Sequence, residues 1–223
     1  MGLKMLRQIL EEMAQRIYRE WFVHFRFPGH ENVKMVDSEL GKIPEGWRVE
    51  TVREMVARRK AGKVYRSKDV LDEGKVVVID QSTDEFLGFH NEVPGHEASP
   101  ERPIAIFGDH TCKMQLMTTH FSVGPNVIPF DTKKQISLQY LYYLIKSMIT
   151  TKEYKRHWNE LITNRVLLAE ENIQLKFTDL IIVILESIRL KQEQNQTLRK
   201  TRDLLLPRLI SGRLDVEDLE MVV

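Results

Sequence analysis

A long uninterrupted helical pattern near the C-terminus constrains this chain most. From about Glu170 to Leu206 no glycine or proline occurs, and apolar residues recur three, four or seven positions apart, which keeps them on one stripe. About 36 residues at about 1.5 Å each make a rod of about 50 Å, whereas an average helix has about 11–12 residues. The second half is polar on its other faces, which favours packing on a partner helix, although packing on the chain's own domain stays an alternative.

A second narrow apolar stripe lies at the N-terminus, over residues 3 to about 23. We predict that the two helices pack as an antiparallel pair, or against the equivalent helices of a second chain in a homodimer. Asn195 falls on the longer seam, where a polar residue can set the register of the helices. The positions assigned to helix contacts are Leu6, Met13, Ile17, Ile184, Ile188, Asn195, Leu198 and Leu205.

Composition indicates an ordinary globular protein. The chain has 223 residues, of which 42% are hydrophobic and 29% charged, enough for one core and an extension. Its single cysteine, Cys112, rules out a cysteine-based zinc cage and favours a reducing compartment. The most apolar run, at 180–185, is too short to cross a bilayer, so we expect a cytoplasmic protein with no membrane partner.

Between the two helices the pattern changes to short strands. Apolar runs bounded by Gly, Pro or Asp predict strands at 75–79, 104–107, 121–123, 126–128 and 166–168. Amphipathic spacing predicts a helix over 137–150, followed by a helix or turn over 152–162. We therefore predict an α+β fold with a short helix at 1–27, a globular domain at 40–169, a long helix at 170–212 and an acidic tail at 213–223.

Two groups of residues are candidates for nucleic-acid contacts. The formal net charge is only +1, but residues 48–68 hold eight basic residues against two acidic ones, and closely spaced cations suit phosphate binding. Polar residues that end two predicted strands are placed to reach base edges. The phosphate candidates are Arg58, Arg59, Lys60, Lys63, Arg66 and Lys68, and the base candidates are Gln81, Ser82, His110, Thr111 and Lys113. A solvated basic face and ordinary polar strand ends are the alternatives.

No catalytic motif accompanies these groups. The sequence has no phosphate-binding glycine loop, no dinucleotide fingerprint, no nucleophile elbow and no paired histidines at metal-binding spacing. We therefore expect a protein that is not an enzyme and holds no metal. Two other functions stay open: a nucleic-acid-processing enzyme with Asp80, Asp109 and His110 as metal ligands, and a helical-arm assembly protein without a role on DNA.

Several motifs together resemble the specificity (S) subunits of type I restriction-modification systems. They are LEEMAQ (10–15), WFV (21–23), LGKIPEGW (40–47), VIDQ (78–81), FGDHT (107–111), LYYL (141–144), NQTL (195–198) and LPRLISG (206–212). The family's two prolines before the last helix are replaced here by Ala169 and Glu170, which leaves the start of that helix less defined. The chain looks like one half of such a subunit, either a fragment or a half-subunit that dimerises.

This resemblance implies a role in sequence-specific binding of double-stranded DNA. It implies that the chain directs methyltransferase (M) and restriction (R) subunits to one half of a bipartite site through one target recognition domain. The chain itself would hold no cofactor, because S-adenosylmethionine, ATP and magnesium belong to the partner subunits. The base sequence recognised does not follow from the resemblance.

Overall fold

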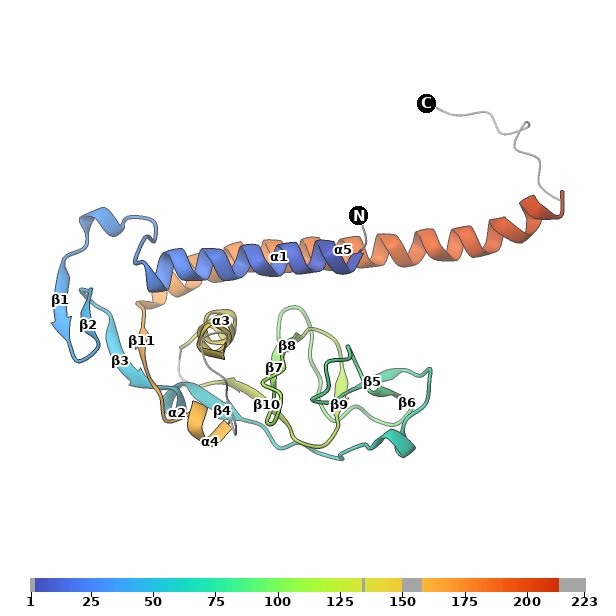
Figure 1. The fold of residues 1–223 in the computed structure, drawn as a ribbon, viewed down its shortest axis with the longest axis horizontal. Coiled ribbons are helices and arrows are strands. Elements are labelled where there is room, and N and C mark those ends of the chain that lie inside the picture. The colour runs from blue at the N-terminus through green and yellow to red at the C-terminus, as the bar shows by residue number, and fades with distance from the viewer. Residues whose placement is uncertain (1–2, 134, 150–157, 213–223) are drawn as a thin grey trace, which may run out of the picture. The chain divides into compact units, whose positions relative to one another are not determined.

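The computed structural model describes residues 3–133, 135–149 and 158–212. It divides into two units: Gln15–Asp179 form one, and the two ends of the chain, Met1–Ala14 and Leu180–Val223, form the other. Helices begin and end the described chain, and short strands predominate between them (Figure 1). The predicted α+β class is confirmed.

The unit at 15–179 contains several small sheets. Two are two-stranded antiparallel sheets, the hairpin of β1 (Met35–Ser38) with β2 (Gly41–Pro44) and the long-range pair of β3 (Arg48–Thr51) with β11 (Arg165–Leu168). A four-stranded sheet has the order β4 (Val56–Arg58), β10 (Val127–Thr132), β7 (Ile104–Gly108), β8 (Met114–Met117). A three-stranded sheet has the order β6 (Gly88–His90), β5 (Val76–Ile79), β9 (Phe121–Val123). The helices are α2 (Val52–Met55), α3 (Leu138–Ile149) and α4 (Trp158–Leu161), with 3-10 turns at His30–Asn32 and Ser67–Asp69.

The predicted strands and the predicted central helix are confirmed as β5, β7, β9, β10, β11 and α3. The sequence did not predict β1, β2, β3, β4, β6 and β8, because none of them is a long apolar run. Residues 28–39, which lie between the predicted short helix and the predicted domain, contain β1. Of the helix or turn predicted at 152–162, α4 is observed at Trp158–Leu161, and 150–157 lie outside the described residues.

An aromatic cluster joins segments from the two ends of this unit. The Phe177 ring contacts Phe22 at 5.2 Å and Tyr143 at 5.8 Å between centroids, and Phe22 contacts Tyr140 at 4.7 Å. Trp47 is also buried and contacts Phe22. Because these rings come from positions far apart in the sequence, the cluster ties Phe22 and Phe177, near the two ends of the unit, into the domain core.

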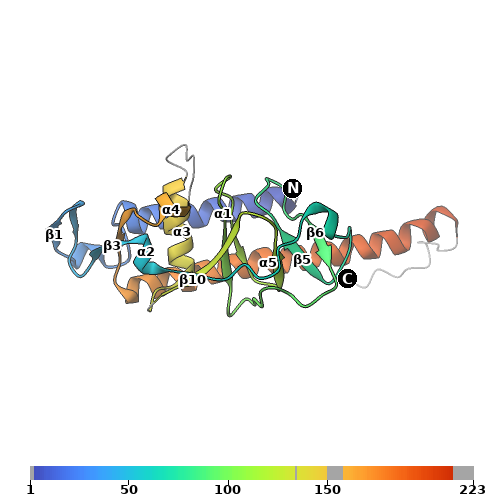
Figure 2. The ribbon, with the colours of Figure 1, turned by 90° about the horizontal axis from the view of Figure 1, so that it is seen from below.

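The two flanking helices are α1 (Leu3–Tyr18) and α5 (Glu171–Ile210). The first helix does not continue to residue 23 as an α-helix, because a π-helical turn occupies Arg19–Val23. In the unit of the two chain ends, α1 and α5 lie side by side and antiparallel, and α5 continues past the start of α1 (Figures 1 and 2). Pro207 lies inside α5, and Gly212, with φ of 64°, follows its end.

The predicted seam residues differ in exposure. Ile17, Ile184 and Asn195 are half-buried, whereas Met13, Leu198 and Leu205 are exposed. The side chains of Leu6 and Ile188 and the acidic tail lie outside the described residues. Pairing of this seam with another chain therefore stays a prediction. Among the described residues, no helix is long and apolar enough to span a membrane.

Candidate nucleic-acid interface

The six predicted phosphate contacts lie on strand β4 and on the segment that follows it. All are exposed. Two are already paired within the domain: Arg59 Nη2 lies 2.6 Å from Asp131 Oδ2, and Lys63 Nζ lies 2.6 Å from Glu92 Oε2. The carboxylates of Asp131 and Glu92 therefore already neutralise the charges of Arg59 and Lys63.

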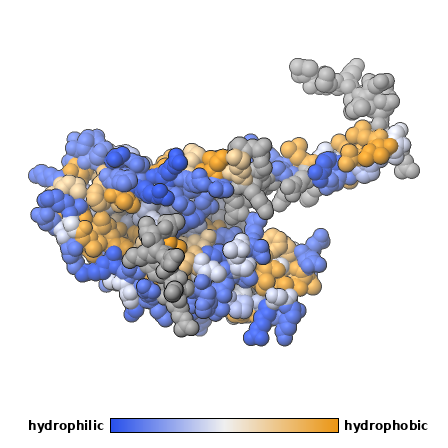
Figure 3. All heavy atoms as spheres, viewed as in Figure 1, coloured by the Kyte–Doolittle hydropathy of each residue, from blue (hydrophilic) through white to orange (hydrophobic). Residues whose placement is uncertain are grey.

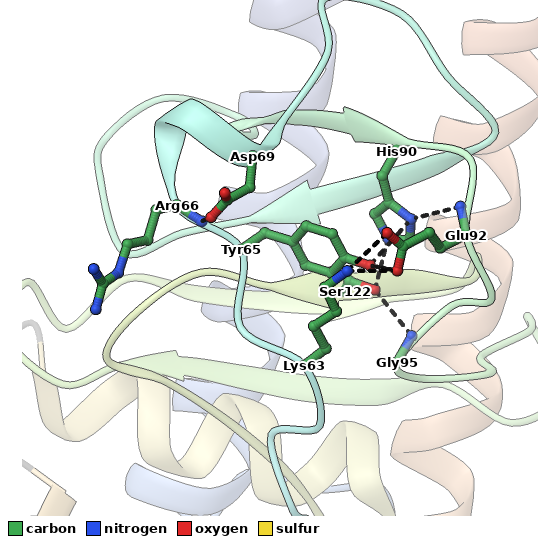
Figure 4. A network of polar contacts seen from close by, with 8 residues as sticks. All are labelled: Lys63, Tyr65, Arg66, Asp69, His90, Glu92, Gly95 and Ser122. Carbon is green, nitrogen blue, oxygen red and sulfur yellow. Dashed lines mark hydrogen bonds and ion pairs between the residues drawn. The ribbon is translucent and has the colours of Figure 1, made fainter.

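The remaining four cations are available. Within the described part of the chain, the side chains of Arg58, Lys60 and Lys68 have no carboxylate or hydrogen-bond partner. The Arg66 backbone N–H donates to Asp69 Oδ2 at 3.0 Å, while its guanidinium group points away from that carboxylate (Figure 4). The structure thus divides a continuous basic run into paired and unpaired cations.

Lys63 belongs to a polar network that the sequence analysis did not detect. Its ammonium group donates to both carboxylate oxygens of Glu92, at 2.7 and 2.6 Å, and the Tyr65 hydroxyl donates to Glu92 Oε2 at 3.0 Å (Figure 4). The hydrogen bond to Glu92 raises the pKa of Lys63, and the one from Lys63 lowers the pKa of Glu92. Both groups are therefore held in their charged forms.

His90 connects this ion pair to the buried sheet. The Glu92 backbone N–H lies 3.1 Å from His90 Nδ1, so Nδ1 must accept and the ring proton resides on Nε2. Nε2 then donates to Ser122 Oγ at 2.9 Å, and the Gly95 N–H donates to the same oxygen at 2.9 Å. The ring also stacks on Tyr65 with centroids 4.2 Å apart. Burial lowers the pKa of His90, which agrees with the neutral ring that these bonds require.

Ser122, His90 and Glu92 do not form a catalytic triad. Ser122 is completely buried, so no substrate reaches its hydroxyl. The Nδ1 atom of His90 faces a backbone N–H and not the carboxylate that would orient it in a nucleophilic site. The network therefore anchors the segment around Lys63 to β6 and β9.

The predicted base-contacting residues come together although they follow different strands. Gln81 Oε1 accepts the His110 backbone N–H at 3.1 Å, and the Thr111 hydroxyl donates to the Gln81 carbonyl at 2.5 Å. Gly108 permits this approach, because a Cβ there would lie 2.8 Å from Thr111 Oγ1 and 2.9 Å from Gln81 Cβ. The ends of β5 and β7 thus form one polar surface.

Several of these side chains are used inside the fold. The Ser82 hydroxyl donates to Asp80 Oδ1 at 2.7 Å, and Lys113 Nζ donates to the Asp84 carbonyl at 2.5 Å. Partial burial lowers the pKa of Lys113, while Asp80, Asp84 and Glu85 act in the opposite direction. Lys113 therefore lies in acidic surroundings and adds little positive potential. Whether any of the five contacts bases is not decided by these bonds and stays a prediction.

The metal-ligand alternative has little support in this geometry. Asp109 Oδ1 accepts the Trp158 N–H at 2.9 Å, at the start of α4, and Asp80 is bonded to Ser82. Across residues 3–133, 135–149 and 158–212, no group of three or more His, Cys, Asp or Glu side chains has the geometry to hold a metal ion.

A cleft of about 630 Å³ lies beside Arg59 but does not suit a phosphate. Arg59 and Arg102 face three carboxylates in its lining, those of Glu97, Glu101 and Asp131. The cations are outnumbered, so the cleft does not attract an anion. The four unpaired cations are the stronger candidate for a phosphate contact.

Comparison with known proteins identifies relatives. No protein-family model matches the chain. It is 23% identical, over 97% of its length, to the type I restriction enzyme MjaIX specificity subunit of Methanocaldococcus jannaschii. The crystal structure of the type I restriction-modification system S subunit from M. genitalium matches 93% of the chain with a TM-score of 0.59 and 17% identity.

The resemblance to type I specificity subunits is confirmed. The S subunit from M. genitalium shares the fold of this chain. The S-subunit-like chain spans about half the length of the relatives that it matches, 55% of each. The resemblance therefore covers about half of such a subunit, which corresponds to one domain, as the motifs in the sequence indicated.

Proposed function

We propose that this chain is the DNA-recognition module of a type I restriction-modification complex and reads one half of a bipartite site. The observation that carries the proposal is the set of four unpaired cations, Arg58, Lys60, Arg66 and Lys68, on a domain with the S-subunit fold. Cations without internal carboxylate partners keep their full attraction for phosphate oxygens. Arg59 and Lys63 would first have to leave Asp131 and Glu92.

The polar surface at the ends of β5 and β7 is proposed to supply base readout. Because Gln81 Oε1 already accepts the His110 N–H, contact with adenine through both amide atoms would require this oxygen to accept a second hydrogen bond. Ser82, Thr111 and Lys113 are bonded internally and would hold the surface in shape. Gln81 and His110, whose contact joins the ends of β5 and β7, are proposed to lie nearest the bases.

Selection of bound duplexes from a random pool tests recognition. The S-subunit-like chain, with its methyltransferase subunit present, should enrich one short sequence, and His110→Ala should reduce that enrichment. Binding to random duplex should persist in His110→Ala, because phosphate contacts supply most non-specific affinity. No binding to any duplex at low salt would refute a DNA-recognition role, and binding without enrichment would refute sequence recognition.

The long helix is proposed to be the assembly element. α1 has 16 residues and α5 has 40, so α1 is too short to cover α5 along its length. The far part of α5 carries exposed apolar side chains, namely Leu190, Leu198, Leu204, Leu205, Leu206, Leu209 and Ile210. Such a surface suits another helix, from a second copy in a homodimer or from the methyltransferase subunit.

Light scattering with and without the methyltransferase subunit tests assembly. Leu198→Asp should reduce the mass of the complex, because Leu198 is 68% exposed within the chain and available to a partner. Leu40→Asp is a matched control, since Leu40 is 47% exposed and lies outside the helices. Equal masses for both variants and the unchanged chain would contradict assembly through α5.

In this proposal the chain carries no catalytic role. The methyltransferase subunit would bring S-adenosylmethionine, and the restriction subunit would use ATP and magnesium. Purified chain alone should therefore neither methylate nor cleave DNA, and methylation should appear only when the methyltransferase subunit is added. Cleavage by the chain alone, with magnesium present, would contradict the assignment.

A further inference from the structure

An exposed apolar patch lies at the end of the domain formed by β5 and β6. We define the apolar patch as Leu71, Phe86 and Phe89. Leu71 is 52% exposed and Phe86 is 41% exposed. Figure 3 shows hydrophobic residues gathered where Figure 1 places β5 and β6. These positions are outside the DNA candidates described above.

Main-chain pairing holds the apolar patch in place. Leu71 and Phe89 exchange backbone hydrogen bonds of 2.8 and 2.9 Å, so their side chains lie on the same side of the bridge. Phe89 in turn pairs with Val77 of β5. The Phe86 ring packs on Phe89 with centroids 4.9 Å apart. The patch is therefore an ordered surface built on a sheet.

Exposed carboxylates adjoin the apolar patch in both chain segments that carry it. Asp72 and Glu73 directly follow Leu71, and Asp84 and Glu85 directly precede Phe86; all four are exposed. Residues 69–92 contain seven acidic residues and one lysine, whereas residues 48–68 contain eight basic residues and two acidic ones. Lys113, which interacts with Asp84 and Glu85 across the fold, is bonded to the Asp84 carbonyl and partly buried.

The apolar side chains and the exposed carboxylates together limit the kind of surface that can cover the apolar patch. A DNA backbone and an anionic membrane are both repelled by four exposed carboxylates. A second copy in a two-fold contact would place the same carboxylates against each other, because both sides of such an interface are the same surface. A different protein with an apolar side chain framed by lysine or arginine meets both requirements.

We propose that the apolar patch and its four carboxylates form a docking surface for a basic face of the methyltransferase subunit. The methyltransferase subunit is chosen as the partner because of the function proposed above. The basic and apolar character of its face is inferred from the exposed carboxylates and the apolar side chains of this domain. The recognition domain would then contact DNA through its unpaired cations and its partner protein through the acidic end. Such an arrangement places the methyltransferase beside the DNA that the domain reads.

Charge reversal at two of these carboxylates tests the proposal in the full chain. Asp72→Lys with Glu73→Lys should weaken binding to the purified methyltransferase subunit at least about tenfold, since like charges would then face each other. The control reverses two exposed acidic residues elsewhere, Glu31→Lys with Asp37→Lys, and makes the same change in net charge. Phe86→Ser, tested separately, should also weaken binding without a change in charge, with circular dichroism checking that each variant is folded.

The outcomes separate this inference from the proposed function. If the unchanged chain binds the methyltransferase subunit and the Asp72/Glu73 variant binds it equally, the docking surface is wrong and the assembly stands. If the unchanged chain does not bind that subunit, the proposed assembly fails and the docking surface with it. A variant that loses DNA affinity, or that changes self-association instead, would show that the patch faces DNA or a second copy and would overturn the proposal.

Discussion

Lys60→Ala and Lys63→Ala should affect DNA binding differently, although the two lysines are three positions apart in one basic run. Lys60 has no partner among the described residues, whereas the Lys63 ammonium lies 2.6 and 2.7 Å from the two Glu92 oxygens. A phosphate contact by Lys63 would require it to give up this ion pair. Of the two lysines, only Lys60 should therefore contact a phosphate and release counterions from DNA.

The size of the difference follows from the number of unpaired cations. If Arg58, Lys60, Arg66 and Lys68 each neutralise one phosphate, the slope of log K against log salt is about −3.6, a loss of about 150-fold between 50 and 200 mM salt. Without Lys60 the slope becomes about −2.7, a loss of about 40-fold over the same range. Lys63→Ala should leave the slope at about −3.6.

Fluorescence anisotropy with a labelled random duplex, at several salt concentrations, measures these slopes. Lys63→Met is a useful second variant, because it keeps most of the side-chain packing while removing the charge. If Lys63→Ala flattens the slope as much as Lys60→Ala does, the division into paired and unpaired cations is refuted. An unchanged slope for Lys60→Ala would remove that lysine from the phosphate contacts.

Three further results are expected. Ser122→Ala leaves the buried His90 Nε2–H donor without its acceptor, whereas the exposed Gly95 N–H can turn to water, so it should lower the free energy of unfolding in urea by about 1–3 kcal/mol; a loss below about 0.5 kcal/mol would contradict the network. Burial lowers the pKa of His90 below 6.5, so the unfolded chain binds the extra proton and stability should decline as pH falls below 6.5. Urea unfolding at two pH values should show a smaller decline in His90→Gln, and an equal decline would exclude His90 as a cause. Gly108→Ala should separate the ends of β5 and β7, because its Cβ would lie 2.9 Å from Gln81 Cβ, and exchange of the His110 backbone N–H, which donates to Gln81 Oε1, should then speed up by NMR; an unchanged rate would mean that the contact adapts.

Local patterns in the sequence were enough to predict many of the helices and strands. A 3.6-residue period predicts a helix wherever it occurs, so α1, α3 and α5 were expected close to their observed positions. Apolar runs likewise predicted β5, β7, β9, β10 and β11. The missed strands, such as β4 and β6, have three residues each and carry too few side chains for a pattern. The π-helical turn after Tyr18 also lacks a periodic signal.

The sequence by itself determined which residues are basic, polar or apolar, and therefore that the chain holds a cation run, two polar strand ends and two helical stripes. Tertiary structure alone decided which of these groups have partners inside the fold and which remain available for contacts with a ligand or another protein. Lys63 meets Glu92 across 29 positions, and Gln81 meets His110 across the same separation. Such pairings depend on how strands from separate segments align, and that alignment is set by long-range packing that leaves no local trace in the sequence. The same packing places Leu71 beside Phe89 and leaves an apolar surface between carboxylates at the end of the domain.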